Sequence, residues 1–194
     1  MQPTREPIRE NVIIYADPER CLGCHSCELA CAMAHSDAHD LVEAVARELP
    51  LRARNRVVLG DGVTMPIQCR QCEDAPCTFA CPTGACRQAG GQIQINEQAC
   101  VGCKLCALVC PFGAITVRSE EVVEDGARTH RGVAKKCDLC VSWRGANGKT
   151  ETACVEACPT RAIRLVDLGA YRLALAEARA RELAQSHRHM RLPL

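Results

Sequence analysis

Large aromatic side chains are scarce in this chain of 194 residues. One Trp, two Tyr and two Phe make up 3% of the sequence. Because such rings dominate the energetics of ordinary cores, the chain has little material for a conventional hydrophobic core. We therefore expect bound metal to supply much of the folding free energy, and we expect the metal-free chain to fold poorly.

Three further absences narrow the class of protein. No apolar run approaches the roughly 20 residues needed to cross a bilayer. The N-terminus has no apolar stretch of signal-peptide length, and Arg5 is followed by Glu6, so no twin-arginine pair occurs. The net charge of +1 provides no strong field for nucleic acid. We expect a cytoplasmic protein without nucleic-acid partners, which would reach the inner membrane face only through a partner complex.

Cysteine, by contrast, is abundant, with seventeen residues. A reducing cytosol disfavours disulfides, so this abundance predicts metal binding. Sixteen of the cysteines fall into four groups with short, repeated spacings, which we call motifs one to four. Their members are Cys21, Cys24, Cys27 and Cys31 (motif one), Cys69, Cys72, Cys77 and Cys81 (motif two), Cys100, Cys103, Cys106 and Cys110 (motif three), and Cys137, Cys140, Cys154 and Cys158 (motif four).

Motifs two and three, CRQCEDAPCTFACP and CVGCKLCALVCP, show the pattern most completely. In each, three cysteines lie close together, a fourth follows three residues later, and a proline comes next. Three such thiolates can wrap one side of a 4Fe-4S cube, and in two-cluster bacterial ferredoxins the fourth ligates the neighbouring cube. The predicted ligand sets are Cys69, Cys72, Cys77 and Cys110 for one cluster, and Cys100, Cys103, Cys106 and Cys81 for another.

Motifs one and four depart from this pattern in one feature each. Motif one has Ala32 in place of the proline, so its helix can continue. Motif four carries an insertion at 141–153, whose Gly-rich and polar composition predicts a surface loop. Motif four alone would also fit a zinc site, but its trailing Pro159 and the three sister motifs favour iron–sulfur clusters.

The four motifs can pair in three ways. A short linker joins motifs two and three, which favours a nested arrangement in which motifs one and four pair around the outside. The main alternative pairs one with two and three with four, and it uses the same sixteen ligands. The nested arrangement adds the sets Cys21, Cys24, Cys27 and Cys158, and Cys137, Cys140, Cys154 and Cys31.

The segments between the motifs indicate an α+β fold. We expect short strands at 11–16, 111–117 and 162–168, and hairpins across 51–68 and around Gly90–Gly91. Residues 119–132 read as a charged loop or hairpin connection. A helix is predicted at 37–49, with Leu41, Val42, Val45 and Leu49 at helical spacing and Pro50 ending it. A second helix is predicted at 169–186, free to dock a partner or to pack on its own domain through Leu168, Tyr171 and Leu175.

This organisation predicts two nested ferredoxin-like modules. The outer module comprises 11–35 with 132–168, and the inner module comprises 66–131. Residues 36–65 form a helix and hairpin insert, and 169–194 form a C-terminal helix and tail.

Several single residues admit two interpretations. Cys86, the seventeenth cysteine, is expected to be a small buried apolar residue and not a ligand. His25 either couples a cluster to pH or is an exposed loop residue. Lys104, Lys135 and Lys136 either raise a cluster potential or are solvated side chains.

Over about residues 11–168, the chain resembles four-cluster ferredoxin-like electron-transfer subunits. The resemblance lies in the stretches CLGCHSCELACAMAHS, CRQCEDAPCTFACPTGA, CVGCKLCALVCPFGAI and KKCDLC with ACVEACPTRAI. Such subunits accompany molybdopterin oxidoreductases, formate hydrogenlyase and carbon monoxide dehydrogenase. CHSCELACAMAHS and PIQCRQCEDAPC most resemble the ferredoxin-like subunit of nickel carbon monoxide dehydrogenase.

The resemblance implies four 4Fe-4S clusters and an electron-transfer role. Electrons would pass from a carbon monoxide dehydrogenase catalytic subunit to a hydrogenase or a flavin NAD(P)H oxidoreductase. The alternative is a subunit of a formate dehydrogenase, formate hydrogenlyase or other molybdopterin oxidoreductase. No catalytic residue is expected. A structural zinc module and a self-sufficient enzyme are the remaining hypotheses, and sixteen complete cysteine positions argue against the open iron site that the enzyme would need.

Overall fold

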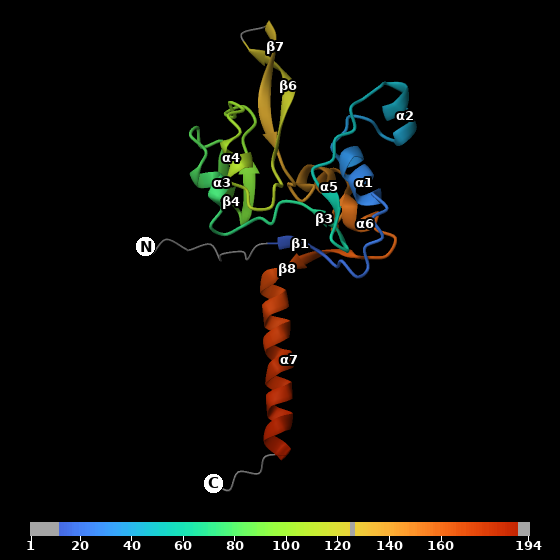
Figure 1. The fold of residues 1–194 in the computed structure, drawn as a ribbon, viewed down its shortest axis with the longest axis vertical. Coiled ribbons are helices and arrows are strands. Elements are labelled where there is room, and N and C mark those ends of the chain that lie inside the picture. Colours follow the sequence, from blue (N-terminus) through green and yellow to red (C-terminus); the bar gives the residue numbers. More distant parts are fainter. Residues whose placement is uncertain (1–11, 125–126, 190–194) are drawn as a thin grey trace.

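The chain forms four two-stranded antiparallel sheets joined by short helices, with one long helix at the C-terminal end (Figure 1). The computed structural model describes residues 12–124 and 127–189. The predicted α+β class is confirmed. In chain order the elements are β1 (Val12–Ala16), α1 (Ser26–Ala34), α2 (Leu41–Ala46), β2 (Arg56–Gly60), β3 (Val63–Ile67), α3 (Pro76–Phe79), β4 (Cys86–Ala89), β5 (Gln92–Ile95), α4 (Leu105–Leu108), β6 (Thr116–Glu124), β7 (Ala127–Lys135), α5 (Val141–Asn147), α6 (Ala153–Glu156), β8 (Ile163–Asp167) and α7 (Leu168–His189).

Strands β1 and β8 pair although they are far apart in the sequence. Their register places Ile14 opposite Leu165 and Ala16 opposite Ile163. Ile14 and Ile163 are buried and belong to the same hydrophobic core. The pairing brings motif one, which follows β1, beside motif four, which precedes β8, and helices α1 and α6 of these motifs contact each other.

The two predicted hairpins are confirmed as β2–β3 and β4–β5. In the second, Gly90 and Gly91 have φ angles of 59° and 74°. Two successive residues of positive φ favour the tight turn that matches the twist of paired strands, and glycine adopts that conformation without strain. This hairpin connects motif two to motif three, and its Ile93 is buried in the core around both motifs.

The helix predicted at 37–49 is shorter in the structure. Helix α2 begins at Leu41 because the Asp40 side chain accepts a hydrogen bond from the Glu43 amide at 2.8 Å, which caps the helix. It ends at Ala46, and Glu48 then has a φ of 51°. The expectation that Pro50 ends the helix is therefore wrong, because the chain leaves the helical conformation before it reaches the proline.

The apolar residues predicted for this helix do not face a core. Val42 is 78% exposed and Val45 is 68% exposed, whereas Ala44 is the buried residue of α2. The pattern identified a helix but not the side that packs.

The nine-residue strands β6 and β7 pair with each other and project from the body (Figure 1). The strand predicted at 111–117 therefore begins later, at Thr116, and extends into the segment 119–132, for which the sequence predicts a charged loop or a hairpin connection. A hairpin satisfies its own backbone hydrogen bonds, so a charged sequence can extend into solvent as paired strands. At its base, Val133 and Ala134 are buried.

The insertion of motif four was predicted to be a surface loop, and this is wrong in part. Its first half forms helix α5, and Gly148 with a φ of 60° ends that helix. The Gly145 in the middle of the segment masked the helical preference of its neighbours.

Two hydrophobic cores lie under the motifs. One surrounds motifs two and three and contains Ile93, Ile115 and Val133. The other joins motifs one and four with Cys69 and contains Ile14 and Leu139. Cysteines belong to both cores, and no Trp, Tyr or Phe is among the buried residues that the structure describes. The cysteines thus take the positions that aromatic rings hold in most small domains.

Helix α7 confirms the predicted C-terminal helix and extends away from the body (Figure 1). It begins where the Asp167 carboxylate accepts a hydrogen bond from the Ala170 amide at 3.0 Å. Residues 170–185 are all exposed, with Tyr171 at 56% and Leu175 at 44%. The alternative in which these two side chains pack on the domain is therefore wrong. Within the described residues, no helix is long and apolar enough to cross a membrane.

Candidate metal centres

One small cavity is lined by all four cysteines predicted for the first cluster. Cys21, Cys24 and Cys27 come from motif one, and Cys158 comes from motif four. Ile163, the first residue of β8, lines the same cavity. The pairing of β8 with β1 therefore places Cys158 against the loop of motif one.

A second small cavity is lined by Cys81, Cys100, Cys103 and Cys106. Three of these belong to motif three, and Cys81 belongs to motif two. The hairpin β4–β5 lies between the two motifs in the sequence and returns the chain so that they face each other. Cys86 also lines this cavity.

The third predicted set is held together around Cys72. Burial raises the pKa of Cys72, and the neighbouring thiols of Cys77 and Cys110 raise it further. Burial also raises the pKa of Cys69, against the opposing positive charge of Lys136, and here too Cys77 and Cys72 are the neighbouring sulfurs. Charge interactions of this kind act over short distances, so Cys72 lies near Cys77 and Cys110, and Cys69 lies near Cys72 and Cys77.

The fourth predicted set is the most deeply buried. Burial raises the pKa of Cys31 to about 12, and its neighbours Cys140 and Cys154 act in the same direction. Burial raises the pKa of Cys140 to about 11 and that of Cys137 well above its usual value. Cys31 comes from α1 of motif one, and the other three come from motif four.

Backbone amides point at sulfurs of these sets. Such N–H groups favour the thiolate form and stabilise a reduced cluster. The donor and acceptor pairs are Arg54 to Cys31 at 3.2 Å, Cys86 to Cys81 at 3.4 Å, Ala134 to Cys100 at 3.4 Å and Ala114 to Cys110 at 3.5 Å.

His25 and Lys104 occupy the same position in motifs one and three, directly after the second cysteine. Both adopt left-handed backbone conformations, with φ of 60° and 67°, and each precedes the first residue of a helix. Both are exposed, and the His25 ring contacts the Glu28 carboxylate at 3.0 Å. This exposure fits the interpretation of both as solvated residues whose backbone turns the ligand loop.

Lys136, which precedes motif four, is not a solvated side chain. It is 4% exposed, and its Nζ donates to the Cys137 carbonyl at 2.9 Å. Its positive charge opposes the rise that burial causes in the pKa of Cys69, and it adds to the lowering of the pKa of Cys77 by the hydrogen bond from Cys86. The interpretation of Lys136 as a charge beside the thiols therefore fits its position, whereas Lys135 forms an ion pair with Glu97 at 2.8 Å.

Cys86 is 4% exposed, as expected for a small buried residue. Its side chain hydrogen-bonds the sulfur of Cys77, and this bond is the main reason why the pKa of Cys77 falls to about 7 and that of Cys86 rises. Its backbone N–H donates to Cys81. Cys86 therefore contacts the ligand sets of two predicted clusters without belonging to either.

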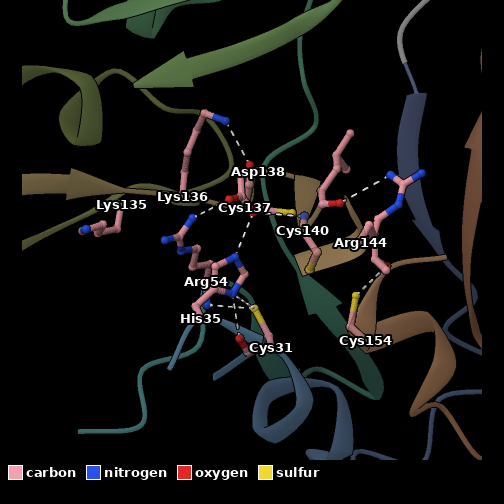
Figure 2. A network of polar contacts seen from close by, with 12 residues as sticks. Cys31, His35, Arg54, Lys135, Lys136, Cys137, Asp138, Cys140, Arg144 and Cys154 are labelled. Atoms are coloured by element: carbon pink, nitrogen blue, oxygen red, sulfur yellow. Dashed lines mark hydrogen bonds and ion pairs between the residues drawn. The ribbon is translucent and has the colours of Figure 1, made fainter. Parts of the chain in front are cut away.

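Three polar residues that the sequence did not single out surround Cys31 (Figure 2). The Asp138 carboxylate accepts from the Arg54 guanidinium at 2.7 Å and lies 2.9 Å from Nε2 of His35. Burial opposes ionisation of Asp138, but the hydrogen bond to His35 and the charge of Arg54 lower its pKa to about 2. The only sequence signal was the position of Asp138 between two ligand cysteines.

The chemistry of these sites fits 4Fe-4S clusters. Thiols converge in groups of four, the surroundings are largely aliphatic, and backbone N–H groups face several of the sulfurs. His35, Asp138 and Cys140 also place ligand atoms within 4.8 Å of one another. The carboxylate in that group is already bound by Arg54 and by the Cys140 amide, so these residues form a polar network and not a separate metal site.

Comparison with known proteins gives the same chemistry. Residues 61–168 match the family described as "4Fe-4S dicluster domain". An "Iron-sulfur protein" of Rhodospirillum rubrum is 76% identical over 96% of this chain and 98% of its own length.

Two relatives from Escherichia coli strain K12 are more distant. "Electron transport protein HydN" is 36% identical over 88% of this chain and 97% of its own length. "Formate hydrogenlyase subunit 2" is 35% identical over 81% of this chain and 82% of its own length. The chain is therefore an iron–sulfur electron-transfer protein of the 4Fe-4S dicluster family.

Proposed function

We propose that this chain binds four 4Fe-4S clusters and passes electrons along them between two redox proteins. The observation that carries the proposal is that two of the four predicted ligand sets each line a cavity of their own. A 4Fe-4S cube needs four thiolates, so four sets account for all sixteen cysteines. The nested grouping of motifs one with four and two with three is part of this proposal.

The accessibility of the cysteines supports a linear order. Of the seventeen, Cys24 and Cys103 are exposed, and the others are buried or partly buried. Cys24 belongs to the predicted set with Cys21, and Cys103 to the set with Cys100. We place these two clusters at the ends of the row, where an outside protein can approach a cluster most closely.

Contacts between the sets order the middle of the row. Cys27 and Cys154 are electrostatic neighbours and link the set containing Cys21 to the set containing Cys31. The Gln71 side chain donates to the Cys137 carbonyl at 3.0 Å and links the Cys31 set to the Cys69 set. The row thus runs through the Cys21, Cys31, Cys69 and Cys100 sets in turn.

The partners follow from the relatives. The formate hydrogenlyase subunit favours service in a complex of the formate dehydrogenase or formate hydrogenlyase type, or with another molybdopterin oxidoreductase. We take this as the first candidate. A carbon monoxide dehydrogenase donor with a hydrogenase or flavin NAD(P)H oxidoreductase acceptor is the second, supported by the sequence CHSCELACAMAHS. A membrane-bound partner complex would bring the chain to the inner membrane face.

Metal and sulfide analysis of the anaerobically purified chain tests the cluster content. We expect about sixteen irons and about sixteen acid-labile sulfides per chain, with reducible EPR signals. Half that iron with stoichiometric zinc, in a colourless or weakly coloured protein, would replace the proposal with the structural zinc module.

Purification of the native chain with its partners tests the complex. A molybdopterin-containing catalytic subunit in the purified complex supports the first candidate. A nickel-containing carbon monoxide dehydrogenase supports the second and rejects the first. Catalytic turnover by the isolated chain would reject both in favour of a self-sufficient enzyme.

A further inference from the structure

A polar network joins three segments that are far apart in the sequence. His35 follows α1, Arg54 precedes β2, and Asp138 lies inside motif four. The Arg54 Nη1 lies 2.7 Å from Asp138 Oδ2, and the His35 Nε2 lies 2.9 Å from Asp138 Oδ1 (Figure 2). The side chains of His35 and Arg54 are 10% and 19% exposed, so both are largely shielded from water, whereas the Asp138 side chain is 36% exposed.

The network contacts predicted ligands from two different motifs. The Arg54 amide donates to the Cys31 sulfur at 3.2 Å, and the His35 Nδ1 lies 2.7 Å from the Cys31 carbonyl oxygen. On the other side, the Cys140 amide donates to Asp138 Oδ1 at 3.0 Å. Cys31 crosses from motif one to complete a set otherwise supplied by motif four. The network therefore fixes the joint between the crossing ligand and its set.

We propose that His35, Arg54 and Asp138 form a positioning network that sets the reduction potential of one cluster, the cluster bound by Cys31, Cys137, Cys140 and Cys154. This inference rests on the proposed four-cluster function. His35 and Asp138 hold Arg54 so that its amide faces a ligand sulfur and its guanidinium stays close to the same cluster. None of the three is a ligand.

The direction of the effect follows from charge. Reduction adds an electron to the cluster, and hydrogen bonds to sulfur and nearby positive charge both stabilise the reduced form. Arg54 supplies both contributions, because its backbone amide donates to the Cys31 sulfur and its guanidinium carries the positive charge. Loss of its charge therefore lowers the potential of this cluster, and because the site is shielded, solvent does not cancel the effect.

The effect is local to one cluster. The amides that face Cys81, Cys100 and Cys110 come from other segments, outside this network. We therefore expect the reduction potentials of the other three clusters not to depend on Arg54.

The test compares Arg54→Met with Arg52→Met in the full, cluster-loaded chain. Arg52 lies in the same segment and loses the same charge, but it is exposed and no described contact joins its side chain to a ligand. Iron content is measured first, and each cluster is then followed by EPR during a redox titration. In Arg54→Met we expect the reduction potential of one cluster to fall by about 59 mV, which is about a tenfold rise in its oxidised-to-reduced ratio at a fixed potential. We expect the reduction potentials of the other three clusters to stay unchanged. Arg52→Met shifts none.

A conservative variant separates positioning from folding. Arg54→Lys keeps the charge and the amide, and we expect it to retain most of the wild-type potential. If Arg54→Met loses iron, Arg54→Gln becomes the deciding variant. The side-chain amide of Gln can still donate a hydrogen bond to Asp138, although the positive charge is gone. A lower potential for one cluster in Arg54→Gln supports the network, and unchanged potentials overturn it.

Equal shifts of all four clusters in Arg54→Met, or no shift at unchanged iron content, also overturn the inference. Failure of the proposed function looks different, because the wild-type chain itself would then show fewer than four reducible clusters before any variant is made.

Discussion

Gly102 of the motif-three ligand loop packs its backbone directly against Gly132 of β7. A Cβ added to Gly102 would lie 2.5 Å from the Gly132 carbonyl oxygen, and real Cβ atoms essentially never come so close to another heavy atom. Gly102 also has a φ of 67°. The close contact fixes how the projecting hairpin meets the loop that carries Cys100 and Cys103.

Gly102→Ala should therefore destabilise the loop beyond the cost of a left-handed alanine. That backbone conformation costs about 1–2 kcal/mol, and overpacking adds about 1–3 kcal/mol. Gly148→Ala is the matched control, since Gly148 has a φ of 60° and no atom near its added Cβ. Visible absorbance of the clusters during heating should be lost at a lower temperature in Gly102→Ala than in Gly148→Ala. Equal temperatures would contradict the contact.

The crossed assignment of fourth ligands predicts a pattern of iron loss in double variants. Cys21 and Cys158 belong to one predicted cluster, so removing both should cost one cluster and leave about twelve irons. Cys137 and Cys158 belong to two, so removing both should leave about eight. Iron analysis of Cys21→Ala/Cys158→Ala and of Cys137→Ala/Cys158→Ala checks this.

Cys86→Ala is the control for cysteine loss and should keep about sixteen irons. The reverse order of the two double variants would show that Cys158 serves its own motif. In the same way, Cys110→Ser should damage the cluster built on Cys69, Cys72 and Cys77, and damage at the motif-three cluster would reject the crossed arrangement.

Cluster retention should depend on pH in a defined direction. Burial raises the pKa of Cys27 and of Cys31 to about 12, so at neutral pH both sulfurs favour the protonated form when no metal holds them as thiolates. Cysteine ligates as the thiolate, so binding releases protons and weakens as the pH falls. Iron transfer to a chelator should speed up from about pH 8.5 to about pH 6.5, after correction for chelation of free ferrous iron. Faster transfer at the higher pH would contradict this.

Removal of α7 should leave the clusters intact. Residues 170–185 are exposed, so their side chains add no burial to the body. A chain that ends at Gly169 should keep its iron content and visible spectrum, and its unfolding free energy should change by less than about 0.5 kcal/mol. Loss of iron in this variant would show that the helix supports the metal sites. If partner purification fails only with the shortened chain, the helix is a docking element.

The sequence alone determined the features that depend on neighbouring residues. Cysteine spacing and the following prolines identified the cluster chemistry, because a cube needs several thiolates on one short loop. The Gly90–Gly91 pair identified a hairpin through local backbone preference. Composition showed that few aromatic rings were available for the core.

Tertiary structure decided what depends on distant contacts. The pairing of Ala16 with Ile163 sets motif one against motif four, and no local pattern encodes it. The side of α2 that packs depends on surroundings, which bury Ala44 and leave Val42 exposed. The sequence left both interpretations of Lys136 open and did not single out Arg54. These two residues become cationic neighbours of the thiols only because separate segments bury them there, and burial strengthens each charge by removing water.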